Sequence, residues 1–471
     1  MDSRISARAL TSLLGFWRTS EPAYEALADG VRLLCLDNRI APRTALPAER
    51  DLAAALVVSR TTVAAAYRSL RDSGHIESTR GSGSVTLPLG RMAVNRTLAG
   101  NGIDLQQASP PAWPGLPGIV AEAAAGATAM ISRAGYDILG NAGLREAIAD
   151  RYRGQGIATE PEQIMVTNGA QSALHLLASV LVHRGDRVLI ETPTYPHAAE
   201  AFRRAGGRLV AVPVSTDDGW DADRATQAFA RTLPVVAYLM PDFQNPTGRT
   251  MTDAERRVFE DAAERAGTLL VVDETTADLN IDRAARPEPF AAGAAAVRVG
   301  SLGKTVWGGL RVGWIRAEED VIRRLLAARS AHDLGTPELE QAVAERLVRR
   351  LDDILPQRSH VLREGRDALA SALAERIPQW RVPVVDGRVA LWIDLGAPLS
   401  SALVMDARGR GLHLSSGPRF AVDGGHERRL RIPFTTGPTE LRRAVEILAE
   451  SWTRVQEGSA QLAPALFEAV V

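Results

Sequence analysis

The sequence predicts a multidomain fold: a small helical module ending in a hairpin, an α/β domain on a mostly parallel sheet, and a smaller α+β subdomain. Three observations predict it. Helical spacing dominates up to about residue 87, where glycines separate two short alternating runs. From about residue 103, short apolar runs alternate with helical stretches, as in a parallel sheet covered by helices. From about residue 331 the pattern is helical with two strand-like runs.

The predicted segments are residues 1–87 for the helical module, 88–102 for a linker, 103–330 for the α/β domain and 331–471 for the subdomain. The composition, 45% hydrophobic and 24% charged, is that of a soluble globular protein. A net charge of -1 excludes a polybasic binder but allows a local basic face. A single cysteine excludes a disulfide framework and a multi-cysteine metal site, and we predict no metal. Without a membrane span or a signal peptide, the sequence predicts a cytoplasmic protein.

The helical module is predicted to hold three helices. Apolar residues recur at helical spacing between residues 24 and 35, and a second helix covers residues 49–56. The third helix runs from its N-cap Ser59 to about Asp72. Residues 75–87 then alternate polar and apolar side chains around a Gly-Ser-Gly tip, which predicts a two-stranded hairpin.

Three helices followed by a Gly-tipped hairpin form the pattern of a winged helix-turn-helix. This fold places the N-terminal residues of its last helix in the DNA major groove, and its hairpin tip can approach a phosphate. Residues 1–87 carry 11 arginines against nine acidic groups, a net charge of +2 (11 − 9). DNA affinity would therefore depend on where the arginines lie more than on the net charge. The pattern alone leaves a dimerisation appendage open. The residues predicted to meet DNA are Ser59, Arg60, Thr61 and Thr62 on the helix and Arg80 and Gly81 on the hairpin.

Specific motifs favour DNA binding. The module resembles the DNA-binding domain of GntR-family bacterial repressors through Leu46-Pro47-x-Glu49-Arg50, Ser59-Arg60-x-Thr62-Val63 and the Gly81-Ser82-Gly83 wing. The resemblance implies that Arg50, Arg60, Thr62 and the wing contact operator DNA. Two departures from the family are Ala48, where a serine is usual, and the stretch 42–45, which lacks the usual glycine.

The lysine count singles out one residue of the α/β domain. Of the 55 basic residues only Lys304 is a lysine, and codon bias explains the arginines but not the exception. Arginine stays protonated, whereas a desolvated lysine can form a Schiff base. Lys304 follows an apolar run in a turn of small residues, Ser301–Lys304. It is therefore a candidate for holding pyridoxal phosphate (PLP), which also needs an acid for its pyridine nitrogen and a phosphate cradle.

The same domain offers the other parts of a PLP pocket. Asp273 ends an apolar run, so we expect its ionised carboxylate at the carboxyl edge of the sheet, facing the ring N–H. The segment Thr167–Gln171 follows a strand and opens a helix, whose amides can hold phosphate. Tyr195 is predicted to stack on the ring and Asn245 to bond its oxygen. Each residue alone also has a structural explanation, as a cap, a turn or packing, and their joint order with Lys304 favours the pocket.

Together these residues resemble a fold-type I aminotransferase from about residue 103 to 460, through Asn245-Pro246-x-Gly248, Asp273 and Ser301-x-x-Lys304. The resemblance implies that Lys304 holds PLP and that Asp273 pairs with the pyridine nitrogen. Arg431 matches the arginine that clamps a substrate carboxylate, a bidentate task suited to guanidinium, although an exposed strand residue is the alternative. Further implied contacts are Gly169, Ala170, Ser301 and Arg311 at the phosphate and Tyr136 across a dimer interface.

One departure concerns the ring oxygen. Many relatives carry a tyrosine two or three positions after the aspartate, where this chain has Thr275 and Thr276. This change affects the tuning of the Schiff base, and hence turnover, more than PLP binding.

The whole arrangement resembles the MocR subfamily of transcriptional regulators over nearly the entire chain. The resemblance implies a homodimer that holds PLP, binds double-stranded operator DNA and responds to PLP or to an amino acid or amine effector. The main alternative is an active PLP-dependent aminotransferase whose N-terminal module only aids assembly. A third possibility is a PLP sensor without further ligand, and the sequence leaves physiological turnover open.

Overall fold

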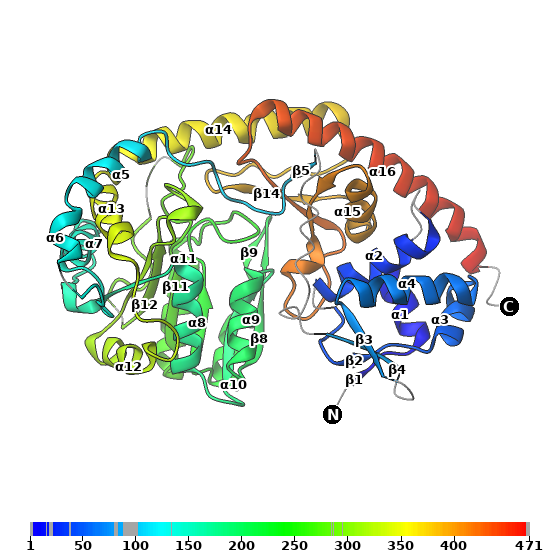
Figure 1. The fold of residues 1–471 in the computed structure, drawn as a ribbon, viewed down its shortest axis with the longest axis horizontal. Coiled ribbons are helices and arrows are strands. Elements are labelled where there is room, and N and C mark those ends of the chain that lie inside the picture. The colour runs from blue at the N-terminus through cyan, green and yellow to red at the C-terminus, as the bar shows by residue number, and fades with distance from the viewer. Residues whose placement is uncertain are drawn as a thin grey trace.

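In the computed structural model the large α/β domain stands at one end of the molecule, the helical N-terminal module at the other, and the small subdomain between them (Figure 1). Two long helices, α14 (Leu351–Arg376) and α16 (Pro438–Phe467), arch along one side of these parts. Arg80, Gly81 and residues 88–101 of the predicted linker lie outside the described residues. The structure describes residues 3–15, 17, 22–36, 39–79, 83–87, 102–132, 134–283, 285, 287–293 and 295–467.

The N-terminal module has the predicted winged helix-turn-helix fold with one helix more than the sequence predicts. The additional helix, α1, begins after Ser6, whose hydroxyl accepts a hydrogen bond from Ala9 N at 3.1 Å. Strands β3 and β4 form the predicted hairpin within a sheet of the order β1-β2-β4-β3. The elements are α1 (Ala7–Leu14), α2 (Ala23–Leu36), α3 (Glu49–Leu56), α4 (Arg60–Asp72), β1 (Ser3–Arg4), β2 (Thr44–Ala45), β3 (Ile76–Thr79) and β4 (Gly83–Thr86).

Apolar side chains on successive turns of α4 explain how this helix docks. Val63, Tyr67 and Leu70 share one face and are at most 1% exposed. The hydroxyl of Tyr67 donates a hydrogen bond to the backbone carbonyl of Pro47 at 2.9 Å, so its polar end is satisfied inside the core. This packing fixes α4 against the turn before α3 and leaves the opposite face of α4 free to contact another molecule.

The large domain is built on an eight-stranded mixed sheet of the order β6-β13-β12-β11-β10-β7-β8-β9. The strands from β12 to β8 are parallel, whereas β13 is antiparallel to β12 and β6, and β9 is antiparallel to β8. The apolar runs that predicted parallel strands form β7, β8, β10 and β11. The strands are β6 (Ile164–Thr167), β7 (Arg187–Thr192), β8 (Arg208–Ser215), β9 (Gly219–Trp220), β10 (Val236–Leu239), β11 (Leu269–Asp273), β12 (Val297–Ser301) and β13 (Gly313–Arg316).

Helices cover both faces of this sheet. Helices α8, α9 and α12 share one core with Val188 and Ile190 of β7, whereas α10 and α11 share another with Leu189, which points to the opposite face. A third core joins α5, α7 and α13 near β6. The helices are α5 (Leu116–Ala125), α6 (Ala127–Ile131), α7 (Ala142–Gly154), α8 (Ala170–Leu181), α9 (Pro196–Arg204), α10 (Ala222–Thr232), α11 (Asp253–Ala266), α12 (Glu319–Arg329) and α13 (Glu338–Val348).

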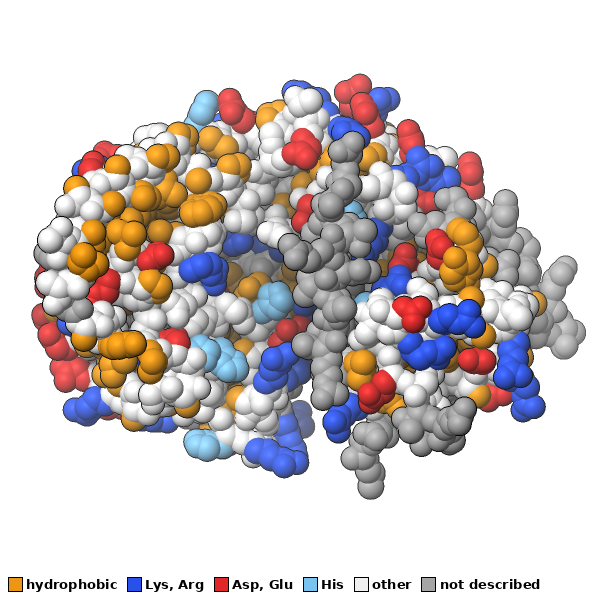
Figure 2. Space-filling model, viewed as in Figure 1, with side chains coloured by type: hydrophobic (Ala, Val, Ile, Leu, Met, Phe, Trp, Pro, Cys, Tyr) orange, Lys and Arg blue, Asp and Glu red, His pale blue; other side chains and the backbone are white. Residues whose placement is uncertain are grey.

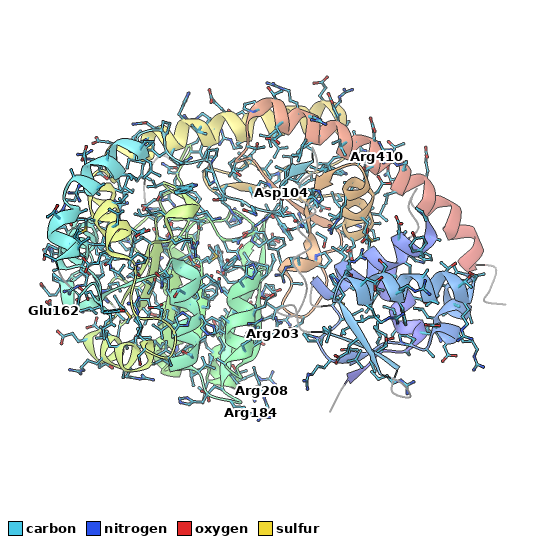
Figure 3. All side chains as sticks on the ribbon, viewed as in Figure 1. Asp104, Glu162, Arg184, Arg203, Arg208 and Arg410 are labelled. Carbon is cyan, nitrogen blue, oxygen red and sulfur yellow. The ribbon has the colours of Figure 1, made fainter. Side chains whose placement is uncertain are left out.

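The small subdomain packs α14, α15 (Ser400–Gly409) and α16 against a three-stranded sheet of the order β14-β17-β16. Arg410, which follows α15, pairs with Glu450 of α16 (Figure 3). The boundary predicted after residue 330 stays a prediction: α13 packs with α5 and α7, and α14 contributes to the cores of both the large domain and the small subdomain. The strands are β14 (Ala390–Asp394), β16 (Ser415–Ser416) and β17 (Arg429–Pro433), and β15 (Leu412–His413) pairs in parallel with β5 (Ile103–Asp104).

The N-terminal module contacts the small subdomain. Arg39 Nη1 lies 2.5 Å from Glu427 Oε1, and Glu427 is held in place by Ser401, whose amide and hydroxyl donate to it at 3.1 and 2.9 Å. Between the module and the small subdomain lies a cavity of about 110 Å³, lined by residues of α2 and α15 and by Gln106. Within the described part of the chain, no helix is long and apolar enough to cross a membrane.

Candidate cofactor site and DNA-binding surface

Two parallel strands bring the predicted lysine and aspartate to the same edge of the large sheet. β11 ends at Asp273, and β12 beside it ends at Ser301, three residues before Lys304. The carboxyl ends of parallel strands form the usual ligand edge of an α/β sheet. Lys304 Nζ donates to the carbonyl of Ala108 at 2.5 Å, so its ammonium has a polar partner here but no carboxylate among the described residues.

The carboxylate of Asp273 is held by side chains of its own loop and of the neighbouring strand. Its Oδ2 accepts from the hydroxyl of Tyr238 at 2.6 Å, and its Oδ1 accepts from the hydroxyl and the amide of Thr275 at 2.6 and 3.0 Å. Burial raises the pKa of Asp273, and the bonds from Thr275 and Tyr238 oppose that rise. Thr275, which stands near the position of the expected tyrosine, therefore orients the aspartate in this structure.

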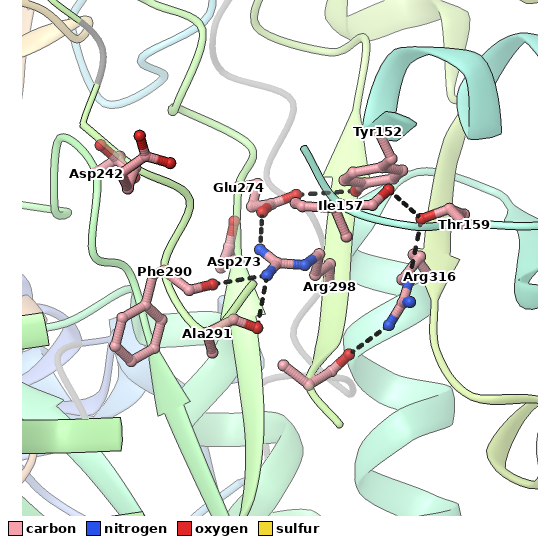
Figure 4. A network of polar contacts seen from close by, with 12 residues as sticks. Tyr152, Ile157, Thr159, Asp242, Asp273, Glu274, Phe290, Ala291, Arg298 and Arg316 are labelled. Carbon is pink, nitrogen blue, oxygen red and sulfur yellow. Dashed lines mark hydrogen bonds and ion pairs between the residues drawn. The ribbon is translucent and has the colours of Figure 1, made fainter. Parts of the chain in front are cut away.

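The next residue, Glu274, anchors the end of β11 to the rest of the domain (Figure 4). Glu274 Oε1 accepts from Arg298 Nη1 at 2.5 Å, and Glu274 Oε2 accepts from the hydroxyl of Tyr152 at 2.8 Å. Arg298 is 1% exposed and also donates to two backbone carbonyls. This buried ion pair holds β11 against β12, and so fixes the relative positions of Asp273 and Lys304.

The predicted phosphate cradle lies in the turn between β6 and α8. Gly169 has φ 81° and begins α8, whose free N-terminal amides attract an anion. Arg311 reaches the same turn and donates to the carbonyl of Asn168 at 3.2 Å. The approach is close, because a Cβ on Gly313 would stand 2.8 Å from the amide nitrogen of Ala170. The hydroxyl of Ser301 donates to the carbonyl of Val312 at 3.2 Å, on the strand that borders this turn.

We expect Gly169→Ala to weaken PLP binding more than its backbone strain explains. The new Cβ would stand 2.7 Å from Arg311 Nη2 and displace that guanidinium. Arg311 would then lose its predicted charge-assisted hydrogen bond to the cofactor phosphate, which should lower PLP affinity by about ten- to a hundredfold. Gly185→Ala is the matched control, because Gly185 also has positive φ (98°) but nothing within 4 Å of its Cβ position. PLP titration of both variants checks this, and equal affinities would contradict it.

The remaining residues predicted to contact the cofactor have different surroundings in the structure. Tyr195 precedes α9 and is partly buried, and its pKa is raised to about 12 by burial and then by the charge of Asp273. Asn245 lies in the loop after β10, and its Oδ1 accepts a hydrogen bond from Arg388 Nη2. Gln171 has a buried side-chain oxygen without a hydrogen-bond partner among the described residues. Tyr136 is 72% exposed, outside the pocket of this chain.

Arg431 lies at the pocket rather than on an exposed strand face. It belongs to β17, the central strand of the small sheet, and is 8% exposed. Its Nη2 donates to the carbonyl of Gln106 at 2.6 Å, and its guanidinium lies 4.8 Å from the ring centroid of Phe420. Burial lowers the pKa of Arg431 to about 10. The alternative of an exposed strand residue is therefore wrong.

Lys304 is surrounded by positive charge. Its pKa is lowered from 10.5 to about 8, chiefly by burial and then by Arg431, Arg388 and Arg311, while Asp273 opposes the shift. A lysine in this state gives up its proton more readily than a solvated one, as formation of a Schiff base requires. Arg388 was not predicted from the sequence, because nothing local distinguishes it from the other arginines.

We expect the stability of the cofactor-free protein to rise between pH 8 and 10.5 because of Lys304. In the unfolded chain the ammonium of Lys304 keeps its proton up to about pH 10.5, whereas in the folded chain it keeps it only up to about pH 8. Between these values the unfolded state binds more protons, so raising the pH favours folding. The rise should be about 3 kcal/mol relative to Lys304→Met, which lacks the titrating group. Urea unfolding of both proteins across this pH range measures the difference, and parallel stability curves would contradict the shift.

The predicted DNA-binding surface is the start of α4. Ser59 caps the helix by accepting from the Thr62 amide at 3.1 Å, and its hydroxyl lies 2.7 Å from that of Thr61. The side chain of Arg60 is 73% exposed and that of Arg50, on α3, is 88% exposed. Each guanidinium makes only a weak, exposed ion pair with a neighbouring carboxylate, so both can still bind DNA phosphates or base edges. Ala48, the departure at the α3 N-cap, makes no side-chain cap bond.

The fold and the two sites define a protein with an aminotransferase-type PLP domain joined to a winged helix-turn-helix. A model of the family "aminotransferase class I and II" matches residues 116–448, and a model of "bacterial regulatory proteins, gntR family" matches residues 23–85. The chain therefore belongs to the class I and II aminotransferase family, whose members depend on PLP, and carries a gntR-family domain before it. This domain combination is that of MocR-type regulators.

Relatives include both enzymes and regulators. The 2-aminoadipate transaminase of Thermus thermophilus is 32% identical over 289 residues, which cover 59% of this chain and 72% of that protein. YisV of Bacillus subtilis, named as an uncharacterized HTH-type transcriptional regulator, is 29% identical over 326 residues, 67% of this chain and 66% of that protein. The crystal structure of LysN, an α-aminoadipate aminotransferase of T. thermophilus complexed with N-(5'-phosphopyridoxyl)-L-leucine, has TM-score 0.70 and 28% identity and covers 78% of this chain and 96% of its own.

Proposed function

We propose that this protein is a PLP-binding transcriptional regulator whose aminotransferase-like domain senses PLP and an amino compound. The observation that carries the proposal is the coexistence, in one chain, of an exposed Arg60 surface on α4 and a pocket that retains Lys304, Asp273 and Arg431. PLP supplies an electrophilic carbonyl to which Lys304 can bind covalently. In this proposal Asp273 holds the ring nitrogen, and Arg431 holds the carboxylate of the amino compound.

The other predicted residues take supporting roles in the proposal. The cofactor phosphate is held at the N-terminal end of α8, and Tyr195 and Asn245 contact the ring and its oxygen. Arg50, Ser59, Arg60, Thr61 and Thr62 form the described part of the DNA surface, with Arg80 and Gly81 at the tip of the wing. The phosphate residues are Gly169, Ala170, Gln171, Ser301 and Arg311.

We propose that the pocket acts on the N-terminal module through the segment around Gln106. Arg431 bonds the carbonyl of Gln106, and Gln106 also lines the cavity that α2 borders. A ligand carboxylate that binds the guanidinium of Arg431 competes with the carbonyl of Gln106 for it. Losing this hydrogen bond shifts the segment around Gln106, which lies between the pocket and α2. The Arg39–Glu427 pair lies in the same interface, so its strength would depend on the same displacement. The coupling is allosteric only if the ligand binds the two arrangements differently.

We propose that the working unit is a homodimer. Exposed hydrophobic side chains gather over α5, α6 and α13 on the large domain (Figure 2). An apolar patch of this kind on a soluble domain marks an interaction surface. In this proposal Tyr136, which lies between α6 and α7 and is 72% exposed, reaches the pocket of the partner. The exposed apolar residues of this region are Val120, Ile131, Tyr136, Ile138, Leu334 and Leu339.

The second candidate is an active aminotransferase, which the intact Lys304, Asp273 and Arg431 favour. Two assays separate the candidates. The regulator should bind its own upstream intergenic DNA more tightly than coding DNA of equal length, and should transfer amino groups at most in a single turnover. Sustained transfer from an amino acid to a keto acid, without preference for the intergenic DNA, would overturn the regulator in favour of the enzyme.

A further inference from the structure

The pocket contains a second buried arginine without an acidic partner. Arg388 is 1% exposed and, within the described residues, no carboxylate lies within ion-pair distance of it or of Arg431. Most other buried arginines have such partners, as Arg298 has Glu274, whereas Arg358 on α14 is held by three backbone carbonyls. A buried guanidinium without a counter-charge is unfavourable unless a bound anion supplies one.

Arg388 contacts the loop that faces the cofactor. Its Nη1 donates to the carbonyl of Gln244 at 2.7 Å, and its Nη2 donates to Asn245 Oδ1. Its Nε has no partner among the described residues. The contacts reach only neutral oxygens, so its charge stays uncompensated. Gln244 in turn donates to the carbonyl of Pro193 at 2.7 Å, and the amide of Thr194 donates to the carbonyl of Phe420, over whose ring Arg431 lies. These contacts connect Arg388 with the part of the pocket that holds Arg431.

The backbone at Arg388 is unusual for a side chain of this size. Its φ is 88°, in the region that favours glycine. The preceding Gly387 is tightly enclosed, because a Cβ there would stand 2.3 Å from the ring of Phe243. A large residue persists in such a conformation when the surrounding structure imposes it, and strained residues of this kind concentrate at ligand sites. The strain, burial and missing counter-charge all fall on one residue beside Asn245.

The cofactor does not account for both arginines. Its phosphate is assigned to Arg311 and the N-terminal end of α8, and its ring nitrogen to Asp273. Arg431 suits the α-carboxylate of an amino compound, which leaves Arg388 for a second anionic group on the same ligand. We infer that the amino compound sensed here carries two acid groups, as an amino dicarboxylic acid does, with the distal carboxylate bound by Arg388. This inference rests on the proposed function and names its effector class.

The experiment measures binding of paired ligands to the full-length, PLP-loaded protein. L-Aspartate, L-glutamate and L-2-aminoadipate are each compared with the apolar amino acid of the same chain length, by the change in cofactor absorption and by the shift in thermal unfolding. At least one dicarboxylate should bind about tenfold or more tightly than its apolar counterpart, as expected for a charge-assisted hydrogen bond.

Two variants connect that preference to Arg388. Arg388→Gly removes the guanidinium, and glycine suits the backbone at φ 88°, so the variant should fold. It should bind the dicarboxylate and its apolar counterpart with about equal affinity. Arg388→Lys keeps the charge but loses the planar fork, and should retain part of the preference. If Arg388→Gly keeps the full preference, or if the wild-type protein shows none, the inference is overturned. A variant that weakens both ligands equally also overturns it, because Arg388 then acts on the cofactor through Asn245.

DNA binding is measured on the same preparations, which separates this inference from the proposed function. PLP-dependent binding to intergenic DNA without a dicarboxylate preference overturns only the effector class. A dicarboxylate preference without DNA binding supports the pocket and overturns the regulator.

Discussion

Substituting Lys304 by alanine should abolish covalent PLP binding and, with it, the response of DNA binding to PLP. The chain contains no other lysine, so no second lysine can take its place. Among the described residues Nζ makes a single hydrogen bond, to a backbone carbonyl, and removing a buried ammonium relieves a desolvation cost, so the variant should fold. The visible absorption of the cofactor after gel filtration and the thermal unfolding midpoint check both expectations.

Lys304→Arg is the matched control, because it keeps the positive charge but cannot form the imine. It should behave as Lys304→Ala does in PLP retention. If either variant keeps PLP through gel filtration, or keeps a PLP-dependent change in DNA binding, Lys304 is not the residue that links cofactor and DNA.

Arg60→Ala should weaken operator binding by about ten- to a hundredfold, which is the loss expected for one good base contact. Its side chain is 73% exposed at the start of α4, and its only ion pair in the described part of the chain, with Glu49 at 3.6 Å, is weak. Stability should therefore change little. Fluorescence anisotropy with labelled intergenic DNA measures the effect at fixed salt concentration.

Arg184→Ala is the control for charge. Arg184 is exposed at the lower end of the large domain in Figure 3 and does not belong to the N-terminal module, so its removal changes the net charge equally without changing α4. The control should bind DNA as the wild type does. Equal losses for both variants would show that bulk charge, rather than the α4 surface, determines binding.

The elements that the sequence predicted well are those with local signals. Helices α2 to α4 carry apolar side chains at helical spacing, and β7, β8, β10 and β11 are continuous apolar runs, so short-range periodicity was sufficient. Lys304 stood out by composition, and Asp273 by its place at a strand end. Helix α1 was missed because its segment is short and ends at Gly15, in a stretch that the hairpin and helix motifs do not include.

The parts that the sequence did not predict depend on contacts between distant residues. Arg388 meets Asn245 across 143 positions, and Arg431 meets Gln106 across 325 positions. Tyr238 donates a hydrogen bond to Asp273, but in the sequence it is only one residue of an apolar run. Its contact with Asp273 arises only when β10 pairs with β11. No local pattern encodes such pairings. In an arginine-rich composition nothing distinguishes Arg388 from the other arginines, whereas Arg431 was predicted through the family resemblance. The Thr275 departure was visible, but its contact with Asp273 was not.

The central claim is that PLP and DNA are bound by one linked system, and one measurement tests it most directly. The affinity of the full-length protein for its upstream intergenic DNA is determined without PLP and after loading with PLP, and PLP affinity is determined with and without that DNA. Linkage requires both ratios to be equal and different from one. Equal DNA affinities in the two states, with PLP bound on Lys304, would contradict the claim.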